Sequence, residues 1–246
     1  MKKLFSLPVF LLLTFFSFGQ YSAGVRLGMN LSTITGQYSE DDEMKKGWTG
    51  GLVFGLVGNY EFTDMISLDA ELLFSTIGGQ YKFSYDEGGD GERSLLADGV
   101  EYKFTEHFHY LQLPVMAKFT FGTDFKFYGI IGPYFGYAMS GHYKYGGDTW
   151  DEPNKGKIKF KEETNPSDDV LYLDPEDFRR FDLGLNVGGG VGKEIGPGTL
   201  EAELRFGMGF LDHNKFDNKD DKPEDYKAFK NICIGITVAY LYDLSK

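Results

Sequence analysis

The stretch LEAELRFGM, residues 200–208, decides the fold class of this chain. Its apolar residues alternate without a break with charged or small residues. A period of two places successive side chains on opposite faces of a β-strand. One face of this strand is therefore purely apolar, and the other carries Glu201, Glu203 and Arg205.

The same alternation recurs along the chain and predicts eight strands. They cover residues 24–32, 48–60, 65–77, 108–120, 125–139, 179–193, 200–208 and 230–242. The fifth is apolar on both faces, so its register stays open. Short turns at 60–64, 122–124 and 194–199 alternate with long polar connections at 34–47, 80–107, 140–178 and 211–229. This layout predicts an all-β fold, an eight-stranded antiparallel up-and-down transmembrane β-barrel with short periplasmic turns and long extracellular loops.

The charged face of these strands is the best candidate site. Inside a barrel of eight strands, side chains can fill the interior completely. Two interpretations remain open: a packed polar core of mutually satisfied ion pairs, which we favour, and a narrow charge-gated pore. The predicted lumen network consists of Arg26, Asp69, Glu71, Lys118, Asp182, Glu201, Glu203 and Arg205.

The N-terminus has the pattern of a secretory signal peptide. Lys2 and Lys3 precede an apolar stretch that ends in small residues before Gln20. We therefore expect a signal peptide over residues 1–19, export to the outer membrane, and a barrel domain over residues 20–246. No later segment has the roughly 20 apolar residues of a membrane helix.

The overall charge of −12 argues against nucleic-acid binding. With only Cys233, the chain has no intrachain disulfide and no cysteine-based metal cage, and we expect no cofactor. All four histidines fall at predicted extracellular strand ends, where we interpret them as interfacial residues rather than metal ligands: His107, His109, His142 and His213. No nucleophile has an evident base beside it, so we expect no enzyme.

A glycine run at residues 188–192, followed by Lys193, superficially resembles a phosphate-binding loop. The P-loop spacing fails, because Val187 stands where the first glycine belongs and Glu194 where Ser or Thr belongs. We instead assign the run to the sixth strand. There its inward glycines would leave room for bulky neighbours such as Arg205.

Four stretches, in this order and spacing, carry a family resemblance: residues 24–32, 110–114, 132–134 and 182–184. The chain resembles the PorT-like, "porin family" outer-membrane β-barrel proteins of Bacteroidetes-type bacteria. The resemblance implies an eight-stranded outer-membrane barrel and suggests an accessory role in secretion. The tail departs from the pattern, because it continues for four residues past the terminal aromatic Tyr242.

Together these features predict a non-catalytic outer-membrane barrel whose acidic loops contact ligands or partners. The longest loop, about 141–177, contains Trp150 and Tyr172 and is the expected contact surface. The alternative is a small porin that passes cations or small solutes through a narrow charged lumen. Expected partners are outer-membrane lipid and an unknown extracellular ligand or envelope protein, with no nucleic acid, and we expect a monomer.

Overall fold

The computed structural model describes residues 20–36, 45–84, 101–147, 154–161, 170–173, 177–215 and 222–245. The predicted signal peptide at 1–19 lies outside these residues and stays a prediction. The described residues form no helix of the length and apolarity that a membrane crossing requires.

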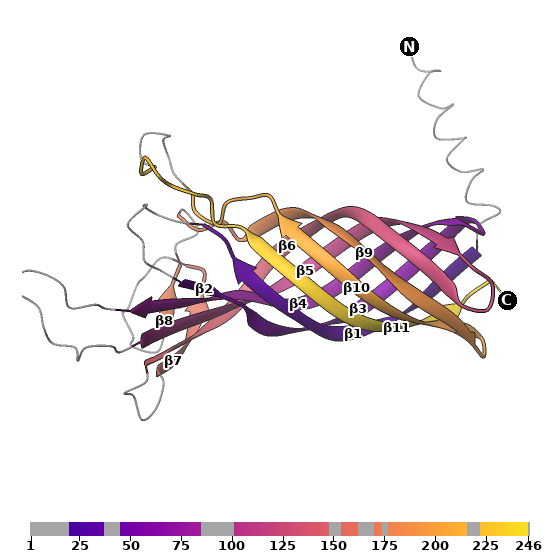
Figure 1. The fold of residues 1–246 in the computed structure, drawn as a ribbon, viewed down its shortest axis with the longest axis horizontal. Coiled ribbons are helices and arrows are strands. Elements are labelled where there is room, and N and C mark those ends of the chain that lie inside the picture. Colours follow the sequence, from indigo (N-terminus) through magenta and orange to yellow (C-terminus); the bar gives the residue numbers. More distant parts are fainter. Residues whose placement is uncertain are drawn as a thin grey trace, which may run out of the picture.

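Eight long antiparallel strands close into a barrel, as predicted (Figure 1). Each strand pairs with the next one in the ring, and β1 pairs with β11 to close it. The ring consists of β1 (Gln20–Ile34), β3 (Thr49–Thr63), β4 (Ile66–Ser84), β5 (Glu101–Phe121), β6 (Lys126–Gly147), β9 (Phe181–Ile195), β10 (Gly198–Gly209) and β11 (Asn231–Asp243).

The two faces of each strand differ as the alternation predicts. In β10, Leu204 points outward and is 56% exposed, whereas Glu203 points inward and is 3% exposed. Outward aliphatic and aromatic side chains recur on all eight strands. An apolar outer band of this kind suits lipid rather than water.

The register of β6, which the sequence left open, follows from which side chains are buried. Tyr128, Ile130 and Tyr134 point into the barrel, while Phe127 and Phe135 point outward. β6 is apolar on both faces because its inward positions carry tyrosines and aliphatic residues instead of charges.

The prediction that the long connections are loops is partly wrong. Strands β4, β5 and β6 run well past their expected ends, and three short strands lie in segments expected to be loops: β2 (Lys45–Gly47), β7 (Asn154–Lys159) and β8 (Val170–Tyr172). Figure 1 shows them beyond the loop end of the barrel, opposite the short turns. The cause is that inward apolar residues recur in these segments and can bury one another.

These extensions enclose a second, apolar core, which we call the cap. Phe108 lies at its centre, and its ring stacks on those of Phe160 and Phe178 at centroid distances of 6.1 and 5.4 Å. The buried residues of the cap core are Ile34, Ile77, Tyr81, Phe108, Tyr110, Ala138, Ile158 and Phe178.

A β-bulge separates the barrel from the cap on β6. Tyr110 pairs with Ala138, but the next residue, His109, pairs with Ser140, so Met139 is an extra residue. An extra residue inverts the inward and outward positions beyond it. In the barrel part of β6 the even-numbered residues point inward. Beyond the bulge this order is reversed, so His142 points outward.

Candidate functional site

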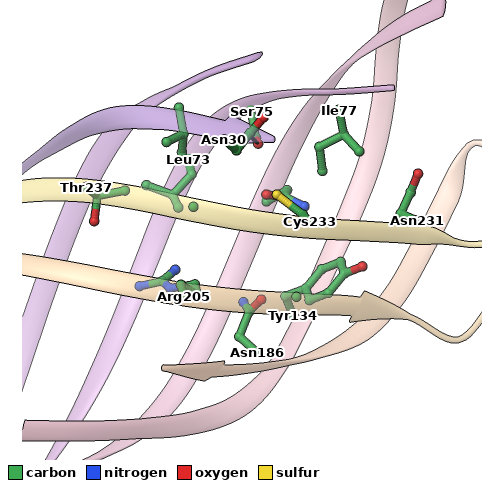
Figure 2. Close-up of a pocket in the computed structure, with 14 residues that line it drawn as sticks. Asn30, Leu73, Ser75, Ile77, Tyr134, Asn186, Arg205, Asn231, Cys233 and Thr237 are labelled. Carbon is green, nitrogen blue, oxygen red and sulfur yellow. Dashed lines mark hydrogen bonds between the residues drawn. The ribbon is translucent and has the colours of Figure 1, made fainter. Parts of the chain in front are cut away.

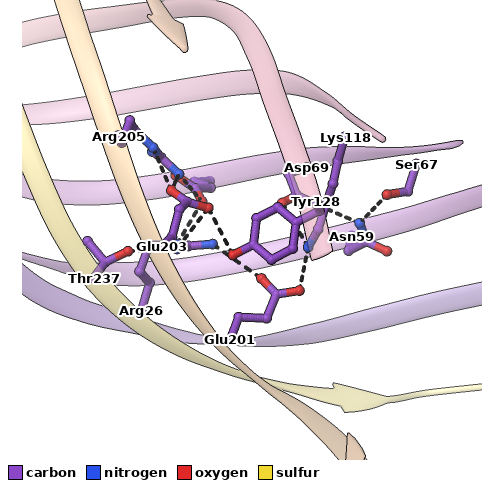
Figure 3. A network of polar contacts seen from close by, with 11 residues as sticks. Arg26, Asn59, Ser67, Asp69, Lys118, Tyr128, Glu201, Glu203, Arg205 and Thr237 are labelled. Carbon is purple, nitrogen blue, oxygen red and sulfur yellow. Dashed lines mark hydrogen bonds and ion pairs between the residues drawn. The ribbon is translucent and has the colours of Figure 1, made fainter. Parts of the chain in front are cut away.

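The interior charges form a connected network (Figure 3). Asp69, Lys118 and Glu201 each stand three residues from a strand end at a short turn, so the network lies in the half of the barrel nearer those turns. Arg26 is the central cation, with Nε 2.9 Å from Glu71 and Nη1 3.3 Å from Glu203. The same Nη1 donates a hydrogen bond of 2.8 Å to the hydroxyl of Thr237. The Arg26 side chain is inaccessible to solvent.

Arg205 binds the same two carboxylates from the opposite side. Its Nη1 lies 2.7 Å from Glu71 Oε2, and its Nη2 lies 2.6 Å from Glu203 Oε1. Nη2 of Arg205 also donates to Glu71 Oε1 at 3.1 Å, so Arg205 contacts both oxygens of Glu71, and Arg26 shares Oε1. Such two-pronged contacts are the strong form of this ion pair.

Lys118 anchors the side of the layer that faces the short turns. It forms ion pairs with Glu201 and, at 3.6 Å, with Asp69, and its ammonium lies 4.2 Å from the ring centre of Tyr128. Asn59 donates to Asp69 as well. Three cations thus face four carboxylates in one connected layer, which we call the charge layer: Arg26, Asp69, Glu71, Lys118, Glu201, Glu203 and Arg205.

Asp182, the eighth predicted residue, does not join the charge layer. It accepts hydrogen bonds from the hydroxyl of Tyr134 at 2.9 Å and from the amide of Asn231 at 2.8 Å. Asn231 also contacts the hydroxyl of Tyr110 at 3.4 Å. These four residues form a second polar layer nearer the cap, which we call the tyrosine layer.

The glycines of β9 explain how two tyrosines fit inside so small a barrel. A β-carbon on Gly184 would lie 2.3 Å from the Tyr134 ring, and one on Gly190 would lie 2.5 Å from the Tyr128 hydroxyl. Gly190 of the run therefore leaves room for Tyr128, and Gly184, which precedes the run, leaves room for Tyr134. Gly188 of the run pairs with Arg205, and a β-carbon there would lie 3.1 Å from the Arg205 Cα. The tyrosine contacts are the ones that the sequence analysis missed.

The spacing of the tyrosines and glycines was the signal that could have identified this contact. Tyr128 and Tyr134 are six residues apart on β6, as are Gly184 and Gly190 on the antiparallel neighbour β9. Register pairs Tyr134 with Gly184 and Tyr128 with Gly190. Each large ring therefore lies beside a residue that has no side chain.

A small cavity of about 50 Å³ lies between the two polar layers (Figure 2). Polar side chains of Asn30, Ser75, Asn186 and Thr237 line it, together with Cys233. That volume suits water molecules rather than a solute. A larger hollow, about 290 Å³, forms a vestibule at the turn end and reaches inward to Lys118 and Glu201 of the charge layer.

Three histidines cluster on the outer surface at the start of the cap. His107 stacks on His142 with ring centres 4.7 Å apart, and Nδ1 of His142 lies 3.2 Å from Nε2 of His109. Among the described residues, no group of three or more His, Cys, Asp or Glu side chains is arranged to hold a metal ion.

His213 lies elsewhere, and its assignment as an interfacial residue is wrong. It is 4% exposed and packs edge-on against Phe108 and Phe178 in the cap core. Burial lowers the pKa of His213 to about 4, although the nearby Asp212 acts in the opposite direction. The imidazole is therefore neutral at pH 7, as an apolar core requires.

The outer apolar band, the closed ring and the charged interior define a membrane-spanning β-barrel with a filled lumen. The chain belongs to the outer membrane protein beta-barrel domain family, whose model matches residues 18–241. Membership implies a location in the outer membrane. No curated protein matches the chain in sequence.

Solved outer-membrane barrels resemble the chain only distantly. OprG of Pseudomonas aeruginosa has 10% identity and a TM-score of 0.39, with 93% of this chain and 96% of OprG covered. Ail, the attachment invasion locus protein of Yersinia pestis, solved with the heparin analogue sucrose octasulfate, has 12% identity and a TM-score of 0.34, covering 91% and 99%. The Escherichia coli outer membrane protease OmpT has 12% identity and a TM-score of 0.32, covering 92% and 96%. Similarity this low transfers no function.

Proposed function

We propose that this protein is a non-catalytic outer-membrane barrel that acts through its extracellular cap, by contacting ligands or envelope proteins outside the cell. The filling of the lumen is the observation that carries the proposal. The charge layer, the tyrosine layer and the cap core follow one another along the barrel axis, and the cavity between the first two holds only about 50 Å³. Because side chains fill the interior of the barrel, its exposed surface is the part that can bind ligands or other proteins.

The packing of the cap supports a role as a preformed surface. The Arg180 guanidinium lies 4.5 Å from the ring centre of Tyr137 and 4.7 Å from that of Phe160. Its Nε donates to the backbone oxygen of Ala138 at 3.0 Å. This side chain, which directly precedes β9, therefore contacts both β6 and the segment after β7. A rigid surface loses less conformational entropy on binding than a loop that must become ordered.

Two narrower ideas belong to the same proposal. The PorT-like resemblance favours an accessory role in protein secretion, with a Bacteroidetes-type source. The longest connection, about 141–177, is the proposed contact surface, because β7 and β8 extend the sheet there. Trp150 lies outside the described residues. We propose a monomer in the outer-membrane lipid, since the ring of strands is closed on itself and needs no partner strand.

We propose that the protein is not an enzyme because of what surrounds Thr49 and His107, the pair that most resembles a nucleophile and its base. The Thr49 hydroxyl lies 2.8 Å from Nε2 of His107, as a nucleophile and its base would. Within the part of the chain that the structure describes, however, no carboxylate hydrogen-bonds to that imidazole, and His142 stacks on its face. A base without an orienting group is a poor catalyst.

The rival function is a small porin for cations. The vestibule favours it, because Glu61, Asp64 and Glu201 line an opening of about 290 Å³ at the turn end. Recording from purified protein in a planar bilayer separates the two functions. We expect no stable unitary currents. Stable cation-selective currents that Glu201→Gln or Glu203→Gln reduces would overturn the proposal in favour of the porin.

A further inference from the structure

The β-bulge of β6 brings histidines of two neighbouring strands together on the outer surface, at the start of the cap. His107 of β5 pairs directly with His142 of β6, and His109 lies on the diagonal, because it pairs with Ser140. Without the extra residue at Met139, an even-numbered residue of β6 would point inward. The bulge therefore places the His142 imidazole on the same surface as that of His109.

The contact between His109 and His142 runs through ring nitrogens. Nδ1 of His142 lies 3.2 Å from Nε2 of His109, and the ring centres are 5.1 Å apart with an angle of 31° between the planes. A tetrahedral zinc ion holds an imidazole nitrogen at about 2.0–2.1 Å, which places two such nitrogens about 3.3 Å apart and their ring centres about 5.2 Å apart. The two nitrogens therefore stand at the separation that one shared ion requires.

Thr76 of β4 determines which nitrogen of His109 is available. Its hydroxyl lies 3.0 Å from Nδ1 of His109, directly across the β4–β5 pair. When Nδ1–H donates to this hydroxyl, Nε2 carries the lone pair that faces His142. The ring of Phe74 also stacks on this imidazole, with centres 5.5 Å apart. A metal-binding histidine usually makes such a hydrogen bond with its other nitrogen, because the bond fixes the tautomer and the orientation of the ring.

His107 holds the ring of His142 in place without being a ligand. The two rings stack with centres 4.7 Å apart and planes 11° apart, so His107 presents its face to His142. Nε2 of His107 lies 2.8 Å from the hydroxyl of Thr49. Among the described side chains, no third His, Cys, Asp or Glu completes the group. The pair therefore offers two nitrogens, and the exposed position of His142 leaves the other coordination positions open to water.

We propose that His109 and His142 bind one divalent transition-metal ion of the kind that prefers imidazole, such as Zn²⁺ or Cu²⁺, with water in the remaining positions. The ion takes the place of the proton that Nδ1 of His142 donates to Nε2 of His109 in the hydrogen-bonded pair. That proton moves through solvent to Nε2 of His142, so both imidazoles stay neutral. For these two residues, the proposal replaces the interpretation that they are interfacial residues only. It does not depend on the proposed function, because a surface site is independent of whether the lumen conducts.

The bound ion joins β5 to β6 at the level where the barrel meets the cap. Only the folded register brings the two nitrogens together, so the ion binds the folded state and stabilises it. Lys157 of β7 pairs with His142, and its positive charge opposes a cation there. The Lys157 side chain is exposed, however, and its flexible stem allows the ammonium to turn into water.

Isothermal titration calorimetry with Zn²⁺ tests the proposal on the full chain, purified in non-ionic detergent without a histidine tag. An excess of Ca²⁺ fills carboxylate sites and leaves imidazole free, so we expect one Zn²⁺ per chain in its presence. His109→Phe and His142→Phe each remove one ligand but keep a ring for stacking. Each should weaken binding about a hundredfold or more, since loss of the partner of a ligating histidine alone weakens it about 10–100-fold. Thr76→Val removes only such a partner and should weaken binding about tenfold or more.

His213→Phe and His107→Phe are the matched controls. The first changes a histidine of the cap core, and the second keeps a ring stacked on His142. Both variants should bind Zn²⁺ as the parent does, and the parent should keep its folded migration to a higher temperature when Zn²⁺ is added, whereas His109→Phe should not. Absence of binding, binding that Ca²⁺ abolishes, or equal weakening by His107→Phe and His109→Phe would overturn the proposal.

Spin-echo electron paramagnetic resonance of the Cu²⁺-loaded parent serves if a ligand variant does not fold, as judged by heat-modifiable migration. We expect coupling of the copper to the distant nitrogens of two imidazoles. Coupling to fewer than two would overturn the proposal.

Discussion

The ring of Tyr128 lies directly across Gly190, so that a β-carbon at Gly190 would come within 2.5 Å of the phenol oxygen. That oxygen also donates a hydrogen bond of 3.3 Å to Glu203 of the charge layer. The ring itself supports the ammonium of Lys118 at 4.2 Å. A glycine of one strand therefore positions a tyrosine of its neighbour, and the tyrosine contacts two members of the charge layer.

The substitution Gly190→Ala should consequently destabilise the barrel. The added methyl group displaces the phenol, weakens its bond to Glu203 and also crowds the backbone oxygen of Ala202, 2.3 Å away. Overpacking of this kind costs about 1–3 kcal/mol. Urea unfolding in detergent, followed by tryptophan fluorescence, measures it. Gly129→Ala is the control, because its β-carbon would point to the lipid side with the nearest atom 3.9 Å away. Equal losses in the two variants would mean that the tyrosine contact is not the cause.

Removing one carboxylate from the charge layer should cost far more than breaking an ion pair at the surface. Glu71→Gln removes one of the two carboxylates that Arg26 and Arg205 share inside a closed lumen and leaves them only Glu203 in common. Loss of one partner from a buried pair costs about 3–5 kcal/mol. Glu194→Gln breaks the 2.7 Å pair with Lys126, in which the Glu194 side chain is 61% exposed, and should cost about 0–1 kcal/mol.

The same unfolding assay compares these two variants. A small loss at Glu71 would indicate that water enters the lumen and solvates the arginines. That result would also favour the porin, because a hydrated charge layer is what a conducting lumen requires.

The sequence predicted the strand count, the ring and the inward direction of the charges, because period-two alternation depends only on which face is buried. It could not assign partners across the ring. Glu71 and Arg205 are far apart in the chain, and only the register of intervening strands places them in contact. Asp182 was grouped with the other charges for the same reason, since parity shows that a residue points inward but not at what height.

The sequence analysis did not predict the cap, for a different reason. Its strands lie in segments whose overall polarity and acidity are typical of loops, and their inward residues, such as Phe104 and Phe108, are separated by lysines and histidines. The bulge at Met139 then inverts the parity on β6. An assignment of inward and outward residues that assumes unbroken alternation along β6 is therefore wrong beyond Met139. His213 was misplaced because nothing in a single sequence indicates that a loop folds back into an aromatic core.

Acid should loosen the cap through His213. Burial holds the pKa of this histidine at about 4, whereas an unfolded histidine titrates near about 6.5. The opened cap therefore binds the proton more readily than the closed one. The stabilising contribution is fully present above about pH 6.5 and is lost as the pH falls toward 4, by about 3 kcal/mol at most. Hydrogen exchange of residues 211–215 should accelerate over that range beyond the intrinsic effect of pH.

The variant His213→Phe isolates this effect. A phenylalanine keeps the aromatic contacts with Phe108 and Phe178 but has no proton to gain. Its exchange in the cap should follow the intrinsic pH dependence alone. An unchanged acid response in this variant would assign the loosening to another group.

Asp212 should hold the connection between β10 and β11 in place, and Asp212→Ala should release it. Its carboxylate accepts hydrogen bonds from the Tyr226 hydroxyl at 2.8 Å and from the backbone N–H of Phe229 at 3.0 Å. Without the carboxylate the segment loses both hydrogen bonds, at a cost of about 1 kcal/mol each. Limited proteolysis of folded protein should then cut residues 211–229 faster by about tenfold or more, while the barrel keeps its heat-modifiable migration. Asp225→Ala removes an exposed carboxylate from the same connection and should leave the cleavage rate unchanged. Faster cleavage in both variants would mean that loss of negative charge, rather than loss of these hydrogen bonds, opens the segment.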